Sequence, residues 1–451
     1  MGLNLNFNEK EIVLTLSVMS DMHTSGSWGV ESSENKLRKA FHYAKKAAGR
    51  DIDAYLFNGD FCDCLNSRPN VVYGIEGWPD TYEEALALQS RAEFDIWHRI
   101  FGEEIDKKSE IIYCLGNHDS NNANNNARFV EEFSSRDSVG DNKNFNRMYR
   151  TDIIKDGMYT GRRHCVFKDY HFICLDRYDD MTDSCKFLRR EMEFAVKDNP
   201  DRYVFVLWHC KTPKCEFCGD SWGSCPEIDT VLKDYPQSVL ITGHTHCALA
   251  NERSILQHEF TVIEASSVSC VAEDTLSAPG SNPLNFTHEE SYKFSQGLII
   301  ELDKTGNMRI RRLDYYREKE IKYPWILKRP CGNKVQLSDY TAARRFEFTP
   351  PLFDDDFQIQ VSSSGENGTF LCFTAAKHGD MVFRYEVKVT DLNGKSRLFY
   401  LSSRFCMHPD TADMPRQLSA VLPIKKDDIY LLSVTPQDVW YNSGHSKFLY
   451  F

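Results

Sequence analysis

The sequence has no apolar run long enough to span a bilayer, since a transmembrane helix needs about 20 consecutive apolar residues. Its first ten residues lack the basic start of a secretory signal, and Gly2 has no Ser or Thr at position 6 to complete a myristoylation pattern. The chain also has no excess of basic residues. Its net charge is -12, which argues against a broad basic surface for duplex nucleic acid. We therefore expect a cytoplasmic protein without a membrane span, for which duplex nucleic acid is not a partner.

Cysteine is plentiful, but its pattern does not suggest a disulfide framework. The 15 cysteines are an odd number scattered over the whole chain. Reduced thiols of a cytosolic protein fit this pattern better than the paired cysteines of a small secreted domain. One local group has a spacing that could hold a structural Zn²⁺ ion, and it comprises Cys210, Cys215, Cys218 and Cys225. Because it contains only one close Cys pair, we interpret the group as free thiols in a loop.

Length and composition predict a soluble chain of two or three domains, with 451 residues of which 41% are hydrophobic and 27% charged. Up to residue 313, strand-like apolar runs alternate with helical segments, which indicates an α/β fold. Residues 314–345 carry charge and two prolines, so we expect a connector. Short strands are then predicted at residues 357–361, 369–373, 382–390, 397–401 and 429–434. With the turn signal Asn393-Gly394, they indicate a small β-sandwich over residues 346–451.

Polar side chains follow five predicted buried strands, at the point where each strand ends. Residues 12–19 lead into Asp21 and His23, which we expect to point to the same side of an extended backbone. The strands at residues 54–57, 111–114, 203–208 and 238–242 lead into Asp60, Asn117 with His118, His209, and His244 with His246. Because parallel strands end along one edge of a sheet, these side chains are expected to meet there.

The chemistry of this set predicts a pair of metal ions. Imidazole, carboxylate and amide ligands together suit Mn, Fe, Zn or Co rather than a thiolate site. Two divalent or trivalent ions are expected because there are too many ligands for one, and Asp60 has two oxygens with which to bridge them. Two divalent ions carry a charge of roughly +4, and two aspartate ligands cancel roughly 2 of it, so the site keeps a positive charge. Metal ions about 3.5–4 Å apart can activate a water and stabilise an in-line displacement at phosphorus.

The same segments, in order, resemble the signature blocks of the calcineurin-like metallophosphoesterases. The matching stretches are Asp21-Met22-His23, Gly59-Asp60, Gly116-Asn117-His118-Asp119, His209 and Gly243-His244-Thr245-His246. Any single block is weak evidence, whereas the ordered set is specific, and the resemblance covers about residues 12–313. It implies a four-layer α/β/β/α sandwich in residues 1–313, which would form the catalytic domain with two metal ions at one sheet edge.

Carried over position by position, the resemblance assigns a role to each residue. The first metal ion would be held by Asp21, His23, Asp60 and His246. The second would be held by Asp60, Asn117, His209 and His244. His118 would protonate the leaving oxygen or steady the transition state.

Asp63 extends the resemblance to the phosphoprotein phosphatases of this family. In those enzymes a second Asp at the matching position orients the catalytic His and raises its basicity. A loop carboxylate that caps a backbone amide is the alternative interpretation. The phosphatases continue with Arg where this chain has Cys64, which departs from their pattern. Purple acid phosphatases have Tyr where Asp63 stands, so an Fe–tyrosinate site is not expected.

We therefore predict a metal-dependent phosphoesterase that acts on a small phosphorylated substrate. A metal-bridging hydroxide would attack a phosphate mono- or diester, and His118 would assist the leaving group. A nuclease or cyclic-nucleotide phosphodiesterase is the alternative among enzymes, although the negative net charge of the chain disfavours duplex DNA as a substrate. A metal-free interaction scaffold of the same fold is the alternative of another class. The sequence leaves open the substrate, the identity of the metals, the oligomeric state and any protein partner of the β-sandwich.

Overall fold

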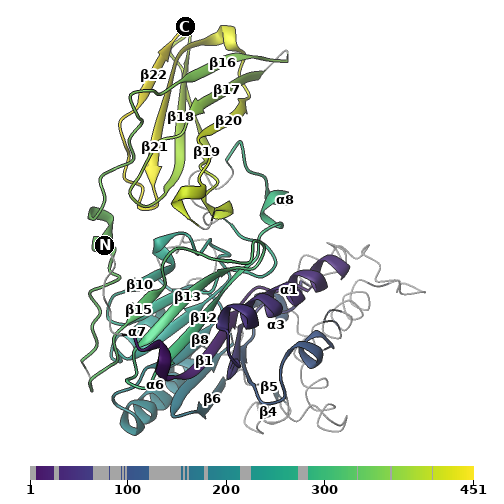
Figure 1. Cartoon of the computed structure of the whole chain (residues 1–451), viewed down its shortest axis with the longest axis vertical. Helices are drawn as coiled ribbons and strands as arrows, with labels where there is room; N and C mark the ends of the chain where they lie inside the picture. The colour runs from purple at the N-terminus through teal and green to yellow at the C-terminus, as the bar shows by residue number, and fades with distance from the viewer. Residues whose placement is uncertain are drawn as a thin grey trace.

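The computed structural model of the protein describes residues 7–24, 30–63, 81, 93, 96, 99–120, 154–155, 158–159, 162–176, 181–213, 225–272, 283–332, 334–365, 368–408 and 410–451. Cys64, Cys215 and Cys218 lie outside these residues. Figure 1 shows two large sheets at one end of the molecule and the C-terminal strands at the other. None of the described helices combines the length and the apolar character needed to cross a membrane.

The first large sheet is mixed and has the strand order β14-β13-β12-β1-β2-β3, with β15 also paired to β13. Its strands are β1 (Ile12–Met19), β2 (Ala54–Asn58), β3 (Glu110–Cys114), β12 (Gln296–Asp303), β13 (Met308–Asp314), β14 (Lys319–Glu320) and β15 (Trp325–Leu327). The parallel strands β1, β2 and β3 end along one edge. Strands β14 and β15 fall within the expected connector, so part of residues 314–345 is built into this sheet.

The second large sheet has the strand order β10-β11-β9-β8-β7-β6. Its strands are β6 (Arg162–Phe167), β7 (Tyr170–Leu175), β8 (Val204–Trp208), β9 (Ser238–Thr242), β10 (Ile255–Gln257) and β11 (Thr261–Glu264). The central strands β7, β8, β9 and β11 are parallel and wholly buried. Their nearly continuous apolar sequences suit strands that are covered on both faces.

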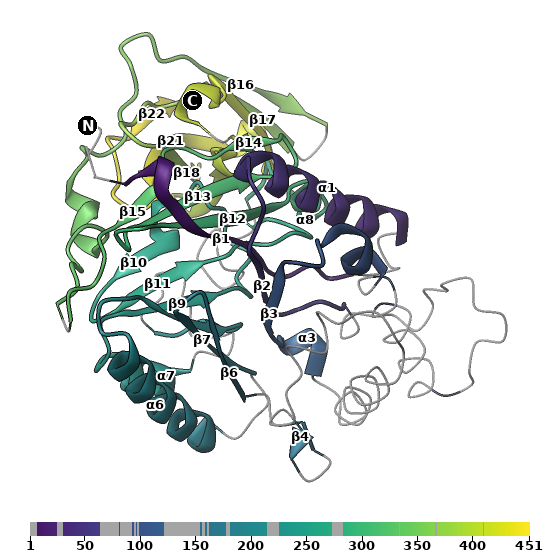
Figure 2. The ribbon, with the colours of Figure 1, turned by 60° about the horizontal axis from the view of Figure 1, so that its bottom comes forward.

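Few helices accompany these sheets among the described residues. They are α1 (Val30–Ala48), α3 (Asn117–Ser120), α6 (Met181–Asp198), α7 (Pro226–Leu232) and α8 (His288–Ser291), and residues 99–104 are also helical. Short 3-10 turns lie at Glu9–Glu11, Glu252–Ser254, Ala342–Phe346, Phe405–Met407, Thr411–Asp413 and Lys426–Asp428, and β4 (Ile154–Lys155) pairs with β5 (Met158–Tyr159). Helix α1 ends before Gly49, where a φ of 62° favours glycine. Figure 2 shows α1 on one side of the two sheets and α6 with α7 on the other.

Three apolar cores hold these elements together. The first includes Leu56 of the first sheet and Phe205 of the second, so the two sheets share it. The second joins Phe41 of α1 to Tyr55 of the first sheet. The third joins α6 and α7 to the second sheet around Trp208. The neighbouring residues Tyr55 and Leu56 face different cores, as the two-residue period of a strand requires.

The C-terminal strands form two antiparallel sheets, with the orders β16-β17-β20 and β19-β18-β21-β22. Their bounds are β16 (Ile359–Ser364), β17 (Gly368–Thr374), β18 (Val382–Asp391), β19 (Ser396–Ser402), β20 (Gln417–Leu422), β21 (Ile429–Asp438) and β22 (Lys447–Tyr450). Side chains of both sheets share one core, for example Leu371 and Val387. Phe383 and Trp440 belong instead to the core between the large sheets, so this region packs directly on the preceding domain.

Candidate metal centre

Five of the predicted site residues have left-handed backbone. The φ values are 51° at Asp21, 40° at His23, 53° at Asp60, 66° at His244 and 54° at His246. This conformation is uncommon outside glycine, costs about 1–3 kcal/mol per residue and clusters at functional sites. It corrects the expectation of extended backbone at Asp21 and His23, because β1 ends two residues before Asp21. Left-handed turns, and not strand alternation, bring these two side chains together.

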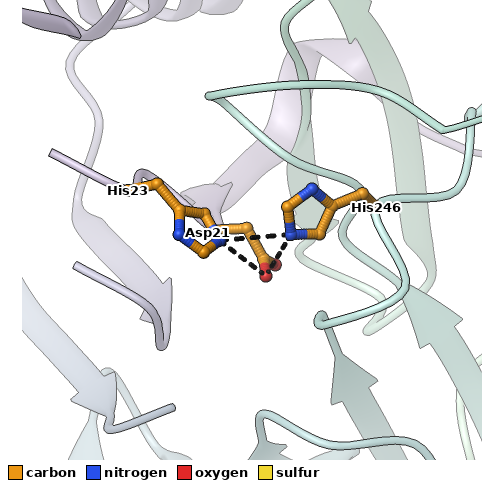
Figure 3. Close-up of side chains that lie close together, drawn as sticks. All are labelled: Asp21, His23 and His246. Atoms are coloured by element: carbon orange, nitrogen blue, oxygen red, sulfur yellow. Dashed lines mark hydrogen bonds and ion pairs between the residues drawn. The ribbon is translucent and has the colours of Figure 1, made fainter. Parts of the chain in front are cut away.

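Figure 3 shows the first group of side chains, in which Asp21, His23 and His246 converge. Oδ1 of Asp21 lies 2.9 Å from Nε2 of His246 and 3.8 Å from Nε2 of His23, and the two Nε2 atoms are 3.2 Å apart. Oδ2 of Asp21 accepts hydrogen bonds from the hydroxyl of Ser20 and from the backbone N–H of His244. The protein thus fixes the orientation of this carboxylate, and the group could hold a cation.

A second group consists of Asp60, His209 and His244, all of which are buried. Oδ2 of Asp60 lies 3.1 Å from Nε2 of His209 and 3.6 Å from Nε2 of His23, so this carboxylate faces both groups. The side-chain oxygen of Asn117 lies 3.1 Å from the same nitrogen of His209. The structure therefore brings together all seven residues for which the sequence analysis expected a metal ligand.

The ring of His209 tests whether a metal ion suits this site. Its Nδ1 lies 2.6 Å from the carbonyl oxygen of Asn58, and a carbonyl can only accept, so Nδ1 carries a proton. In the neutral ring Nε2 then holds a lone pair, yet it faces oxygens of Asp60 and Asn117. Three lone pairs pointing at one another require a positive charge between them, which either a metal ion or a second ring proton can supply. The residues present therefore fit a metal ion.

The pKa values of these groups reflect the same need for positive charge. Burial alone would raise the pKa of Asp21, but His246 and His209 hold it well below its usual value. Burial alone would lower the pKa of His209, but Asp60 and Asp21 raise it to about 9. Without a bound metal ion, protons on imidazoles supply the charge that the carboxylates need.

Two motif glycines lie against predicted ligands. A Cβ at Gly116 would lie 2.1 Å from Oδ1 of Asp60, and a Cβ at Gly243 would lie 2.6 Å from Oδ2 of Asp21. Both distances are far shorter than van der Waals contact. These positions therefore require glycine because the backbone of one loop touches a carboxylate of another.

His118 lies at the edge of the same cluster. Its Nδ1 is 3.5 Å from Oδ1 of Asp63, but that oxygen is nearer, at 3.2 Å, to Nδ1 of His23. Asp63 therefore faces two imidazoles and not His118 alone. Its own backbone N–H donates to Glu93. Burial lowers the pKa of His118 to about 4, so its ring is neutral at pH 7.

Asp119 was part of the recognised motif, but the sequence analysis gave it no role. Its carboxylate is fully buried and accepts the backbone N–H groups of Phe61, Cys62 and Gly116 at 2.8, 3.1 and 2.9 Å. These donors belong to the loops that follow β2 and β3. A single carboxylate thus ties together the two loops that carry Asp60 and His118.

Two further residues support the cluster. Sγ of Cys270 lies 2.9 Å from Nδ1 of His246, which helps to orient that ring. No signal in the sequence pointed to this cysteine. Asp176 follows β7 and accepts the backbone N–H of Leu115 at 2.7 Å. Asp176 could have been found in the sequence, because it is a carboxylate directly after a buried strand, as several of the predicted metal ligands are.

The expected cysteine loop is described only at its two ends. Cys210 is buried and Cys225 is partly buried, whereas Cys215 and Cys218 lie outside the described residues.

The comparisons with known proteins agree with this geometry. Paired sheets with Asp and His groups that could hold metal ions define a candidate metal-binding α/β protein. A family model described as calcineurin-like phosphoesterase matches residues 14–248, just over half of the chain. The protein therefore belongs to the calcineurin-like phosphoesterase family, which implies a phosphoester hydrolase in general terms. Searches of curated proteins and of solved structures gave no match.

Proposed function

We propose that the protein hydrolyses a phosphate mono- or diester of a small substrate with two metal ions. One ion would be held by Asp21, His23, Asp60 and His246, and the other by Asp60, Asn117, His209 and His244. The position of Asp60 supports this proposal most strongly, because its Oδ2 atom faces a histidine nitrogen from each group. When bound, the metal ions would activate a water and neutralise charge on the phosphate.

The side chains around the metal ions would position the reacting groups and stabilise the leaving group. His118 lies beside Asp60 and Asp63, and the N–H of its neutral ring can donate a hydrogen bond to a leaving oxygen, which would steady the transition state. Asp63 would restrict the tautomer and orientation of His118 while it also holds His23. The backbone N–H of His118 fixes this residue against Asp60, so the hydrogen-bond donor stays next to the metal groups.

We also propose the finer domain organisation. Residues 1–313 would form a four-layer α/β/β/α catalytic domain, residues 314–345 a connector that adds β14 and β15 to the first sheet, and residues 346–451 a β-sandwich. The shared core between the large sheets supports the layers, as do the separate cores beneath α1 and beneath α6 with α7.

A panel of phosphate mono- and diesters assayed with Mn²⁺, Zn²⁺ and Fe²⁺ tests the function. EDTA should abolish hydrolysis. Asp60→Asn should lower both metal content and activity, because Asp60 faces both groups. His118→Ala should slow hydrolysis by about 100-fold or more with metal retained. His445→Ala, at an exposed C-terminal position, is the matched control. A chain that binds no metal and hydrolyses none of the esters would instead be the interaction scaffold.

A further inference from the structure

A second pair of histidines lies on the hairpin of β6 and β7. His171 pairs with Val166, and His164 lies two residues before Val166, so both rings project from the same face of the hairpin. His171 lies five residues before Asp176, which places it about 16 Å from the sheet edge that carries the metal centre. This pair is therefore separate from the site described above.

Each of the two rings is hydrogen-bonded to a carboxylate of α6. Nδ1 of His164 lies 2.6 Å from Glu191, and Nε2 of His171 lies 3.1 Å from Asp198. Ionised carboxylates only accept hydrogen bonds, so both of these ring nitrogens carry protons. The remaining nitrogens, Nε2 of His164 and Nδ1 of His171, then hold lone pairs in the neutral rings. They face each other at 2.9 Å, and a cation between them would remove their repulsion.

The geometry of this pair matches that of the candidate metal centre. The ring centroids of His164 and His171 are 5.1 Å apart, as are those of His23 and His246, whose facing nitrogens are 3.2 Å apart. Histidines that bind metal ions usually donate their other N–H to a carboxylate or carbonyl, which fixes the tautomer. Both members of the β6–β7 pair have such a carboxylate partner.

We propose that His164 and His171 bind one divalent transition-metal ion of the Zn²⁺ class, separate from the sheet-edge centre. Zn–N bonds are about 2.0–2.1 Å long, so two neighbouring nitrogen ligands on one ion lie about 3 Å apart. The facing nitrogens of His164 and His171 are already at about this separation, so only the rings would have to turn. Water would complete the coordination. Burial and the neighbouring His164 keep the pKa of His171 below its usual value, so this ring is neutral, as metal binding requires.

Phe194 and the two carboxylates tie this site to α6. The ring centroid of Phe194 lies 5.8 Å from that of each imidazole, and the ring packs edge-on against both, while its side chain is exposed. A metal ion held by His164 and His171 would therefore fasten the edge hairpin to α6 through Glu191 and Asp198. We expect a structural role, since the ion would reinforce an edge of the second sheet.

Zinc titration of the full-length protein tests this site. The protein is stripped with a chelator, and the titration is done in an Asp60→Asn background that weakens the sheet-edge centre. The zinc stoichiometry of this variant should fall by one equivalent on adding His164→Gln or His171→Gln and should stay unchanged on adding His445→Gln. Zinc should raise the melting temperature of the background variant, and addition of His164→Gln should reduce that increase.

A gentler variant guards against misfolding. Glu191→Gln keeps both imidazoles and removes only the carboxylate, so zinc affinity should fall about 10-fold or more. Equal zinc stoichiometry with and without His164 would overturn the proposal. A proton shared between the two rings would then explain their close contact. If the phosphoesterase proposal is wrong, the wild-type protein will hydrolyse none of the esters. That result is independent of whether His164 and His171 bind zinc.

Discussion

The backbone N–H of His118 donates a hydrogen bond to Oδ1 of Asp60 over 2.8 Å. The two residues are 58 positions apart, and the bond joins the loop after β2 to the short helix α3 that follows β3. Because Oδ1 is held in this way, Oδ2 is the oxygen that faces His209 and His23. The protein alone therefore sets the orientation of the carboxylate on which the proposed metal pair depends.

Gly116→Ala should disable the site by disturbing this contact. The new Cβ would lie 2.1 Å from Oδ1 of Asp60 and 2.5 Å from its backbone nitrogen, so one loop must move. A displacement of about 1 Å at a catalytic site costs on the order of 100-fold in rate, and we expect a loss of that size in kcat/KM. Overpacking should also lower the free energy of unfolding by about 1–3 kcal/mol.

Gly102→Ala is the matched control for that experiment. Gly102 lies in the helical residues 99–104, and a Cβ there meets nothing within 4 Å. Alanine is favoured over glycine in a helix by roughly 0.5–1 kcal/mol, so this variant should be slightly stabilised with unchanged activity. Equal activity of the two variants in ester hydrolysis and urea unfolding would show that the contact at Gly116 does not matter.

The convergence of the site residues could be predicted from the sequence because each of them follows the end of a predicted buried strand. Uninterrupted apolar runs identify buried parallel strands, and such strands end along one edge. The left-handed backbone at Asp21 and His23 could not be predicted in the same way. Residues other than glycine rarely adopt it, and only the surrounding tertiary contacts hold it there.

Other features were missed for different physical reasons. Strand β22 is a short edge strand, which carries little signal, whereas β20 alternates regularly between exposed and buried residues and was detectable. The contact of Cys270 with His246 depends on a loop crossing that no local pattern records. The hydrogen bonds that Asp119 accepts from two loops could not be predicted either, because their donors are backbone N–H groups, which every residue except proline has.

Asp119→Asn should loosen both loops while the fold remains. The carboxylate accepts three backbone N–H groups in a buried position, and an Asn amide turns one of its two acceptor atoms into a donor. Leaving buried N–H groups without acceptors costs about 1–3 kcal/mol, which urea unfolding would measure. Metal affinity should fall as well, by about 10-fold. Asp51→Asn, at an exposed position, should change neither quantity.

The stability of the metal-free protein should depend on pH through His209. The pKa of this ring is raised to about 9 in the folded protein, against about 6.5 in an unfolded chain. Its contribution is fully present below about pH 6.5 and is lost as the pH rises to about 9. The free energy of unfolding of chelator-treated protein should therefore fall by up to about 3 kcal/mol across this window.

His209→Gln provides the control for that measurement, because it removes the titrating ring. Its pH dependence in urea unfolding should be flatter than that of the wild type over the same window. Metal-loaded wild-type protein should also show a flatter profile, since a metal ion replaces the proton. A metal-free protein that gains stability between pH 6.5 and 9 would contradict the assignment.

A partly buried carboxylate, Glu252, connects the two large regions of the chain. It accepts hydrogen bonds from Arg312 at 2.8 Å and from the indole of Trp325 at 3.1 Å. Lys322 lies 3.4 Å from the same carboxylate and also bonds to Asp380 beyond β17. Glu252 therefore neutralises cations at the junction with the C-terminal sheets.

Glu252→Gln should weaken this junction more than it affects the metal centre. An amide keeps the size of the side chain but leaves Arg312 and Lys322 with less negative charge, and losing hydrogen bonds to a charged group costs about 1.5–3 kcal/mol. We expect lower stability in urea unfolding and faster proteolysis between residues 328 and 380, with metal content unchanged. Glu318→Gln is the control, because the pair of Glu318 with Lys46 is exposed and salt-screened, so its loss should not be measurable. Equal stability of the two variants would mean that the apolar contacts of Phe383 and Trp440 hold the C-terminal sheets in place without the help of Glu252.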